Sequence, residues 1–468
     1  MAQPKRRTKH PEWGINDFSG GLNNKIDDNL INDNQASELQ NVICNTVGSL
    51  TSRKGQTKIN TSALPGPILG LSPYYLGAKK EILVASNGSI YKWSGALMIG
   101  IKSGWDAAAR VYFENTVNYA VAFNGVDAPV KYDGTNISNL ANAPTGNYPT
   151  LFKEKLFIAP SADKSQLNWS DSFAPESWPA VNYWDVKKGD GDEIKALAPY
   201  LRDLTIFKQY SIHVLSGTSI DDFSLSEADG KVGAVSNRAV TFHGNYLYFV
   251  GTDGIYRWNG FKPVNMTEGI IPKTWDGINK EYLSVATAGT WEHFLWFAVP
   301  HGTATTSDTI LVFDVISESW WVFKGITPSC FCIFNDGTGQ KFYSGHATEG
   351  YVMRQDFGDS DDGEIIESFW TGKTFDGGNA AYKKKIKKFF VVDGPGAHDV
   401  DISVSLDYGD FETLPLAQEE ALLRRYGKSE DTSGYWRYLR PKFSHSVLNQ
   451  SFEVRGSLLT FKVKSNPK

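Results

Sequence analysis

The sequence has little cysteine, no long apolar run and no apparent export signal. Only Cys44, Cys330 and Cys332 occur, an odd number without metal-site spacing, so we expect buried thiols rather than a disulfide framework or a zinc site. This favours folding in a reducing compartment. No stretch reaches the roughly 18 apolar residues of a membrane span, and the basic first ten residues lack the apolar region of a signal peptide. We therefore expect a soluble, non-secreted chain without membrane insertion.

An excess of positive charge is also absent, and so is long helical periodicity. The 47 Lys and Arg against 52 Asp and Glu give a net charge of −5, unlike the strongly basic surface of a sequence-reading nucleic-acid binder. What the chain does contain is 44 Gly, 20 Pro, 14 Trp, 21 Tyr and 27 Phe. Turn formers together with strand-favouring aromatics predict an all-β protein.

One phrase occurs twice in the chain. Residues 87–95, NGSIYKWSG, return in similar form at residues 253–260, DGIYRWNG. Asn-Gly and Asp-Gly suit the positive φ angles of a tight turn, and the alternating apolar residues that follow are typical of a strand. Each copy is therefore predicted to be a β-hairpin, ended by the second glycine.

Weaker copies of this strand follow the first at regular intervals. The intervals between successive copies are 37 to 55 residues, and a four-stranded propeller blade takes roughly 40–50. We therefore predict a β-propeller of about seven blades, with six to eight open. The reference residues of the copies are Trp93, Tyr132, Trp169, His213, Trp258, Phe313 and Arg354.

The chain divides into three predicted regions. Residues 1–65 form an N-terminal arm with a short helix over residues 33–42, and residues 66–358 form the propeller. An acidic linker opens the third region, 359–468, which is predicted to be a β-sandwich-like platform domain. Within it, residues 416–425 favour helix, because glutamates precede arginines along the segment in the sense that complements the helix dipole.

The N-terminal arm resembles a known family of phage proteins. The motif segments are DFSGGL at residues 17–22, NDNQASELQNV at 32–42, GSL at 48–50 and RKG at 53–55. This pattern is similar to the start of the tail nozzle, or packaged-DNA-stabilisation, proteins of short-tailed bacteriophages. The rest of the chain matches that family only in architecture, a propeller followed by a β-rich platform.

The resemblance implies a structural virion protein of the tail, assembled in the host cytoplasm. It implies a homo-oligomeric, hexameric ring beneath the portal and its adaptor ring, in contact with other tail proteins such as a needle, fibre or tailspike. Such a ring retains packaged double-stranded DNA without reading its sequence and conducts it into the host at ejection. It implies no catalytic residue, cofactor or metal. Relatives with the same opening sit elsewhere in tails, so the position along the tail axis stays open.

Two groups of residues are candidates for these contacts. The first would fix the arm to the propeller or to a neighbouring subunit, and Gly21→Val is predicted to block ring assembly more than folding. The second is a lysine run that would touch DNA or an acidic partner, or would simply protect a solvated edge strand. The first group is Phe18, Gly20, Gly21, Leu22, Arg53 and Gly55. The second is Lys383, Lys384, Lys385, Lys387 and Lys388.

Strand alternation divides the lysine run between two faces. Lys383, Lys385 and Lys387 are predicted on one face, and Lys384 and Lys388 on the other. In a channel, a mildly acidic or neutral wall lets DNA slide, whereas a strongly basic wall holds it. Repeated around a ring, these lysines would locally reverse the sign of the wall's charge and slow the DNA.

Two other classes of function remain open. A propeller glycoside hydrolase would need paired carboxylates about 5–10 Å apart, and a carbohydrate- or receptor-binding module would use exposed aromatics. In the pair Trp320 and Trp321, alternation predicts that at least one ring is exposed or at an interface. The carboxylate candidates are Asp190, Asp192, Glu193, Asp221 and Asp222; the aromatic candidates are Trp178, Tyr183, Trp184, Trp320 and Trp321.

Overall fold

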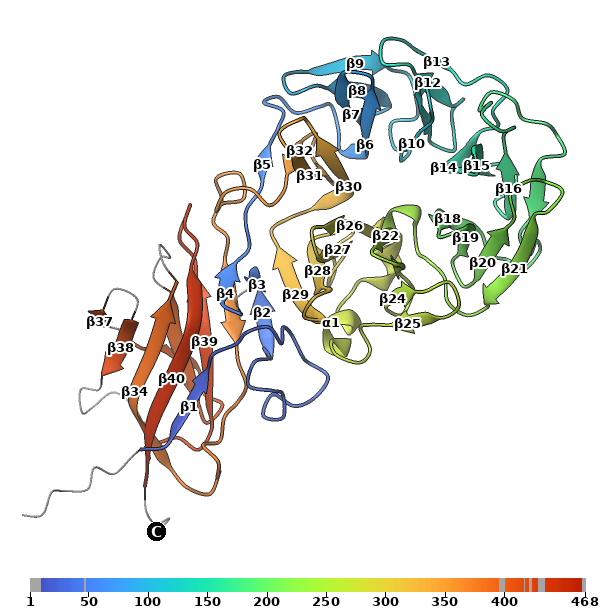
Figure 1. Ribbon diagram of the computed structural model, residues 1–468. Coiled ribbons are helices and arrows are strands. Elements are labelled where there is room, and N and C mark those ends of the chain that lie inside the picture. Colours follow the sequence, from blue (N-terminus) through green and yellow to red (C-terminus); the bar gives the residue numbers. More distant parts are fainter. Residues whose placement is uncertain are drawn as a thin grey trace, which may run out of the picture.

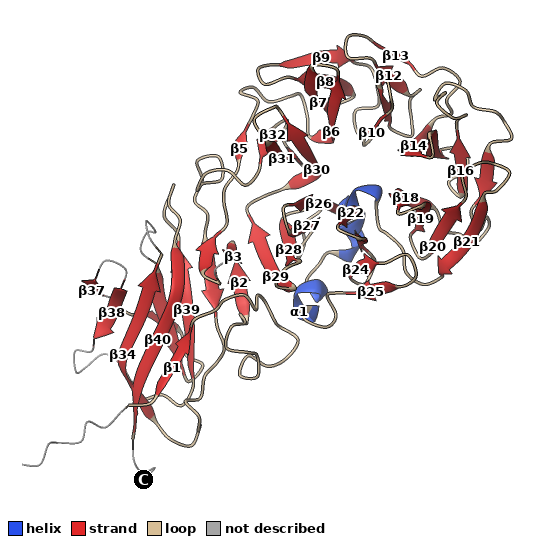
Figure 2. Ribbon diagram, viewed as in Figure 1, coloured by secondary structure: helices blue, strands red, loops and turns tan. Residues whose placement is uncertain are grey.

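A ring of four-stranded sheets lies beside a two-sheeted body in the computed structural model (Figure 1). The structure describes residues 10–45, 48–394, 400–415, 417–420, 423–427 and 434–464. Strands dominate these residues, and the helices among them are α1 (Pro272–Asp276), η1 (Asn237–Ala239) and η2 (Lys280–Val285), as Figure 2 shows. None of them is long or apolar enough to cross a membrane.

The first four sheets of the ring are consecutive meanders, numbered here as blades. Blade 1 comprises β6 (Ile68–Leu76), β7 (Lys79–Ser86), β8 (Ser89–Trp93) and β9 (Met98–Lys102). Blade 2 comprises β10 (Tyr112–Asn115), β11 (Ala120–Phe123), β12 (Val130–Tyr132) and β13 (Ile137–Asn139). Blade 3 comprises β14 (Gly146–Phe152), β15 (Lys155–Pro160), β16 (Gln166–Trp169) and β17 (Tyr183–Asp185). Blade 4 comprises β18 (Ile194–Tyr200), β19 (Asp203–Lys208), β20 (Ile212–Ser216) and β21 (Ser224–Asp229).

Three more blades complete the ring, and the last takes its outer strand from the N-terminal arm. Blade 5 comprises β22 (Val240–His243), β23 (Tyr246–Val250), β24 (Ile255–Trp258) and β25 (Pro263–Asn265). Blade 6 comprises β26 (Thr287–Trp291), β27 (Phe294–Val299), β28 (Thr309–Asp314) and β29 (Ser319–Lys324). Blade 7 comprises β30 (Pro328–Asn335), β31 (Gln340–His346), β32 (Val352–Arg354) and β5 (Thr57–Lys58).

The predicted β-propeller is confirmed, and the structure describes seven blades. Each of the seven reference residues of the sequence repeat lies in the third strand of its own blade. The first strands, β6, β10, β14, β18, β22, β26 and β30, surround the central opening (Figure 1). The repeat is therefore the third strand of a meander, a position that is paired on both sides and buried between neighbouring blades.

The two strongest copies of the repeat form hairpins by different turns. At the first, Asn87 and Gly88 have φ of +45° and +69°, as predicted. The second has no such pair: Gly251 N–H donates to Gly254 O (2.8 Å), which closes a longer loop. A Cβ on Gly254 would lie 2.3 Å from the Asn265 amide nitrogen. Glycine is needed there for close approach rather than for a positive φ.

The platform beside the ring is built from both ends of the chain. Its first sheet contains β1 (Glu12–Ile15), β3 (Val42–Cys44), β4 (Leu50–Ser52), β40 (Glu453–Val463), β34 (Lys384–Asp393), β38 (Leu423–Gly427) and β37 (Ala417–Glu420). Its second sheet contains β2 (Glu38–Gln40), β33 (Ser368–Thr371), β39 (Leu439–His445), β35 (Asp401–Leu406) and β36 (Phe411–Thr413). Both sheets contribute to one hydrophobic core, which continues into blades 5 and 6.

Both predicted helices are wrong. The segment 33–42 contains β2, which pairs with β33, and Asn41 after it has a left-handed φ of +54°. A ten-residue helix is marginal in isolation, so pairing with a buried strand overrides the weak local preference. In the segment 416–425, the described residues belong to β37 and β38. There the charge order fitted a helix dipole, but strand pairing with β34 decides the structure.

The arm joins the platform to the propeller along the outer edge of β29. Leu22 N–H donates to Trp320 O (2.8 Å) and Asn41 N–H donates to Val322 O (2.8 Å). The Asn41 side-chain oxygen accepts from Lys324 N–H (2.8 Å). Trp320 and Trp321 are both 0% exposed, and the Trp320 ring packs against Phe297 and Phe313 within the propeller. Neither ring is therefore exposed, contrary to that part of the prediction.

Candidate functional site

The six arm candidates lie inside the chain, around the junction of the arm, the platform and the propeller. Phe18 packs edge-on against Trp370 and Phe443, with ring centroids 5.2 and 5.9 Å apart. A Cβ on Gly20 would lie 2.7 Å from Asn34 O, and one on Gly55 would lie 1.9 Å from Ser360 O. These glycines permit backbone segments to touch.

Gly21 and Leu22 connect this junction to blade 6. Gly21 has φ of +59°, and a Cβ there would lie 2.6 Å from Trp320 O, the acceptor of the Leu22 N–H bond. The Leu22 side chain is buried. Of the two predicted partners of the arm, propeller or neighbouring subunit, the structure places the propeller against these residues.

Arg53 is the buried charge of the junction. Its guanidinium donates to both carboxylate oxygens of Asp361, with an Nη1–Oδ1 distance of 2.8 Å. It also donates to Asn41 Oδ1 (2.9 Å) and to Lys324 O (2.8 Å). The arm, the outer strand of blade 6 and the linker after blade 7 thus share one guanidinium, and its planar fork suits this multiple contact.

The lysine run does not follow the predicted alternation. β34 has a bulge between Ile386 and Lys388. Neither Lys387 nor Lys388 is therefore among the alternate residues of the strand that face the core. Lys384 is buried, and its ammonium donates to Asp376 O, Asn379 O and Arg437 O. Lys384 is therefore a structural residue. The grouping of Lys384 with Lys388 on one face is wrong, because a bulge inverts the alternation beyond it.

The lysine strand is also not an edge strand. β34 pairs with β40 along its length and with β38 from Lys388 to Val392. The interpretation of the lysines as protection for a sheet edge is therefore wrong for this half of the strand. On the same side, Lys384 pairs with Trp436 through two backbone hydrogen bonds (2.7 and 2.9 Å), and no β38 partner is described for Lys385 to Lys387.

Two lysines that the sequence analysis missed complete a basic surface, called here the lysine face. It comprises Lys383, Lys385, Lys387, Lys388, Lys462 and Lys464, with Lys462 directly opposite Lys385 in the β34–β40 pair. Lys385 and Lys464 ammonium groups lie 5.7 and 4.8 Å from the Tyr435 ring centroid. Lys462 and Lys464 could have been found from the sequence, because residues at alternate positions near the end of the last strand lie on the same face.

Positive charge is concentrated on the lysine face. Like charges directly opposite on two strands destabilise a sheet. Within the described residues, no carboxylate oxygen lies within 4 Å of Lys387, Lys388, Lys462 or Lys464. A partner with negative charge would relieve the repulsion between these ammonium groups.

The central opening of the propeller is crossed by Arg238. From η1, its guanidinium donates to Ser329 O (3.1 Å), to Val111 O (3.1 Å) and to Leu69 O. These carbonyls belong to blade 7 and to the segments at the starts of blades 2 and 1. A side chain bound across the opening leaves no room for a DNA duplex to pass through a single propeller.

Glu114 lies on β10, in the innermost strand of blade 2. The surrounding protein raises the pKa of its carboxyl to about 7, because burial disfavours the charged form. Sequence analysis did not single out this residue, since one glutamate in a short strand carries no pattern.

The carboxylates considered for a glycosidase stabilise turns of blade 4. Asp190 accepts from the buried Lys208 ammonium (2.6 Å). Asp192 accepts from the backbone N–H groups of Gln209 and Tyr210. Asp222 accepts from the backbone N–H groups and the hydroxyls of both Thr218 and Ser219, and these bonds lower its pKa to about 2.

The remaining sequence candidates have ordinary structural surroundings. The three cysteines are buried and unpaired, as predicted, and burial raises the pKa of Cys44 to about 12. Trp178 is partly buried and donates to Pro175 O (2.7 Å). Tyr183 is half exposed and Trp184 is partly buried, both on β17.

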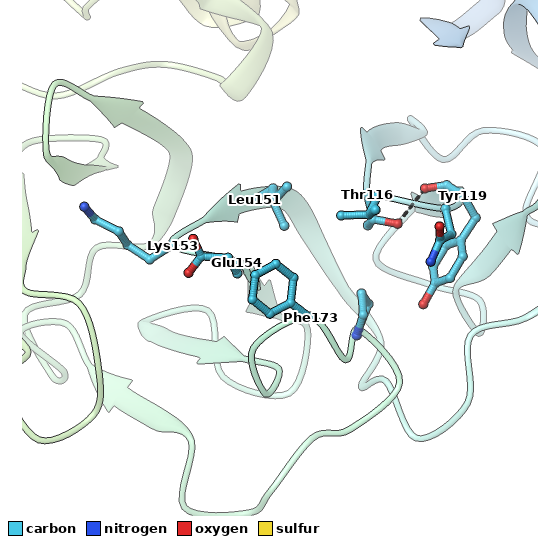
Figure 3. Close-up of a pocket in the computed structure, with 9 residues that line it drawn as sticks. Thr116, Tyr119, Leu151, Lys153, Glu154 and Phe173 are labelled. Atoms are coloured by element: carbon cyan, nitrogen blue, oxygen red, sulfur yellow. Dashed lines mark hydrogen bonds between the residues drawn. The ribbon is translucent and has the colours of Figure 1, made fainter. Parts of the chain in front are cut away.

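A surface pocket of about 260 Å³ lies between blades 2 and 3. Figure 3 shows Thr116 and Tyr119 on one side, Lys153 and Glu154 on the other, and Phe173 between them. Phe173 is 72% exposed, unusual for so large an apolar ring. The pocket combines an exposed aromatic ring with one charge of each sign, features that are also common in binding sites for small polar ligands and peptides.

Comparisons with known proteins bear on the fold alone. No protein-family model and no curated protein matches the chain. Among solved structures, it is similar to the Pan2 WD40 domain of Neurospora crassa, with 8% identity over 65% of this chain and 96% of that one, at a TM-score of 0.40. It is also similar to PorZ, a surface component of the type-IX secretion system of Porphyromonas gingivalis, with 11% identity over 68% of this chain and 42% of that one, at a TM-score of 0.39.

We predict that Gly21→Ala lowers the stability of the chain itself. Both Gly21 (φ +59°) and Gly77 (φ +60°) have left-handed backbones, but a Cβ at Gly77 meets nothing within 4 Å. Gly77→Ala should therefore cost about 1 kcal/mol for the backbone alone. Gly21→Ala should cost at least about 2 kcal/mol, because the clash with Trp320 O is added. Urea denaturation of both variants measures the difference, and equal losses would contradict the proposed contact.

We predict that Glu114 makes stability fall as pH rises. The folded chain keeps a proton there up to a pKa of about 7, whereas the unfolded carboxyl loses it near 4.5. The free energy of unfolding should therefore fall between about pH 4.5 and 7. Glu114→Gln should remove this fall in stability. The control variant Glu412→Gln, at an exposed glutamate, should leave the fall unchanged. Identical pH profiles for Glu114→Gln and wild type would refute the assignment.

Proposed function

We propose that this chain is a structural subunit of a short phage tail, forming a ring that retains packaged DNA and conducts it at ejection. The lysine face is the observation that carries the proposal. An overall acidic chain gathers Lys387, Lys388, Lys462 and Lys464 on one sheet, where Lys462 faces Lys385 across the strand pair. Phosphates of DNA match this arrangement, since a row of ammonium groups binds a backbone without reading bases.

The resemblance of the N-terminal arm to nozzle proteins supports the same proposal. The residues that carry it, among them Phe18, Gly21 and Arg53, join the propeller to the platform. A subunit of a ring requires a joint of this kind, because its propeller and its platform must hold the same relative position in every copy. The proposal requires no catalytic residue.

The DNA path in such a ring lies between subunits. Arg238 bonds across the opening of each propeller, so the propeller is a wall element and its own hole is not the conduit. Copies of the chain around a common axis would enclose the channel, and the lysine faces would supply local positive charge to a wall that is otherwise mildly acidic. Such a channel would hold DNA strongly at the level of the lysine faces and would let it slide along the rest of the wall.

A host-receptor-binding module is the second candidate function. The observation that favours it is the pocket beside Phe173, which has an exposed aromatic ring between Glu154 and Tyr119 (Figure 3). Such a module would bind a surface glycan or peptide as a monomer.

We predict a ring in solution or on an adaptor. Native mass spectrometry of the purified chain, alone and with a portal-adaptor assembly, should show a species near six times the 51.9 kDa subunit mass. A ring that forms only on the adaptor supports the proposal equally. A chain that stays monomeric with the adaptor would contradict it, and glycan binding by that monomer would support the receptor-binding alternative.

We predict salt-sensitive binding of double-stranded DNA through the lysine face. The double variant Lys387→Glu, Lys388→Glu should weaken binding and reduce the slope of log K against log salt by about 2, because two phosphate contacts are lost. Lys231→Glu with Lys262→Glu makes the same charge change on exposed propeller loops and should leave the slope unchanged. Fluorescence anisotropy with DNA duplexes of unrelated sequence measures both. Equal weakening by the two double variants would exclude a specific role for the lysine face.

A further inference from the structure

A small cavity lies at one mouth of the propeller's central opening. It has a volume of about 110 Å³, several times the space that one water molecule needs. Its wall includes Arg110, Arg238, Thr306, Ser307 and Ser329. Arg110 and Arg238 precede the first strands of blades 2 and 5, Thr306 and Ser307 lie in the loop between β27 and β28 of blade 6, and Ser329 lies in β30 of blade 7. The cavity is therefore formed only when the ring of blades is closed.

Two guanidinium groups reach this cavity without a carboxylate. Arg110 donates to Ser284 O (2.9 Å), and Arg238 donates to three backbone carbonyls. Among the described residues, no carboxylate oxygen lies within 4 Å of either group. Burial and the neighbouring charge of Arg238 lower the pKa of Arg110. Neutral groups alone, namely backbone carbonyls and the Tyr112 side chain, thus contact the two positive charges among the described residues.

Donor groups remain available at the same place. A guanidinium carries five N–H donors, of which the carbonyls take three from Arg238 and one from Arg110. Arg110 also donates to the Tyr112 hydroxyl oxygen, and the Arg238 guanidinium lies 5.3 Å from the Tyr112 ring centroid. This leaves about three N–H donors on Arg110 and two on Arg238 for a ligand. Thr306, with its hydroxyl, lies on the same wall.

We propose that this cavity binds a small dianionic oxyanion of the phosphate or sulfate type. Two guanidinium groups match its charge, and their planar N–H forks match its oxygens. The volume admits a tetrahedral anion with a few waters but no nucleic acid backbone. The two guanidinium groups are partly buried, and like charges repel there more than in bulk water, so a bound dianion stabilises the closed ring of blades by joining blade 2 to blades 5 and 7. This site is independent of the proposed tail function.

Titration calorimetry of the full chain with inorganic phosphate tests the proposal. At constant ionic strength, wild type should bind one phosphate saturably, sulfate should compete, and acetate, a monoanion, should compete more weakly. Arg110→Gln should raise the Kd at least about tenfold, which corresponds to one charge-assisted hydrogen bond. Arg202→Gln, at an exposed arginine of blade 4, should bind as wild type does. No saturable binding at millimolar phosphate, or wild-type affinity in Arg110→Gln, would overturn the proposal.

A second measurement does not depend on any variant. Crystals of the wild-type chain soaked in sulfate should show a tetrahedral anion between the Arg110 and Arg238 guanidinium groups. Anion density only at other surface arginines or lysines would overturn the assignment of this cavity.

Discussion

The outer edge of β29 is the constraint on which the arrangement of this molecule depends. An outermost propeller strand presents a row of unpaired backbone groups, and here Leu22 and Asn41 bind the carbonyls of Trp320 and Val322. Asn41 performs a second function through its side chain, which accepts from Lys324 N–H and from Arg53. A strand edge that would be free in an isolated propeller thereby becomes the seat of the platform.

Several features of the platform follow from that joint. The N-terminal arm supplies strands to both platform sheets and β5 to blade 7, so one segment closes the propeller and completes the second body. Because buried polar groups must be paired, the Arg53–Asp361 contact connects the linker after blade 7 to the same place. The hydrophobic core then runs from blades 5 and 6 into the platform without interruption. The orientation of the lysine face relative to the propeller is a consequence of this shared core.

The local sequence pattern correctly predicted those strands whose own residues favour a strand. Trp93 and Trp258 belong to strands whose alternation and glycine turns are visible in a few residues, and the same holds for the other third strands. The prediction failed where a distant partner decides. Residues 38–40 pair with β33 across more than three hundred residues, and Trp321 is fully buried in the core that the arm, the platform and blade 6 share. Lys384 is buried where its ammonium donates to the carbonyls of Asp376 and Asn379 nearby and of Arg437, 53 residues along the chain.

The sequence by itself determined the all-β class, a propeller of about seven blades, the location of one repeated strand in each blade and the lysine-rich start of β34, because these depend on residues close together in the chain. Only the tertiary structure decided the rest. It placed Arg110 and Arg238 at one cavity, Lys462 opposite Lys385, and Gly21 against Trp320. Each of these pairs joins segments that are far apart in sequence, and their contact arises from ring closure and strand pairing rather than from any local preference.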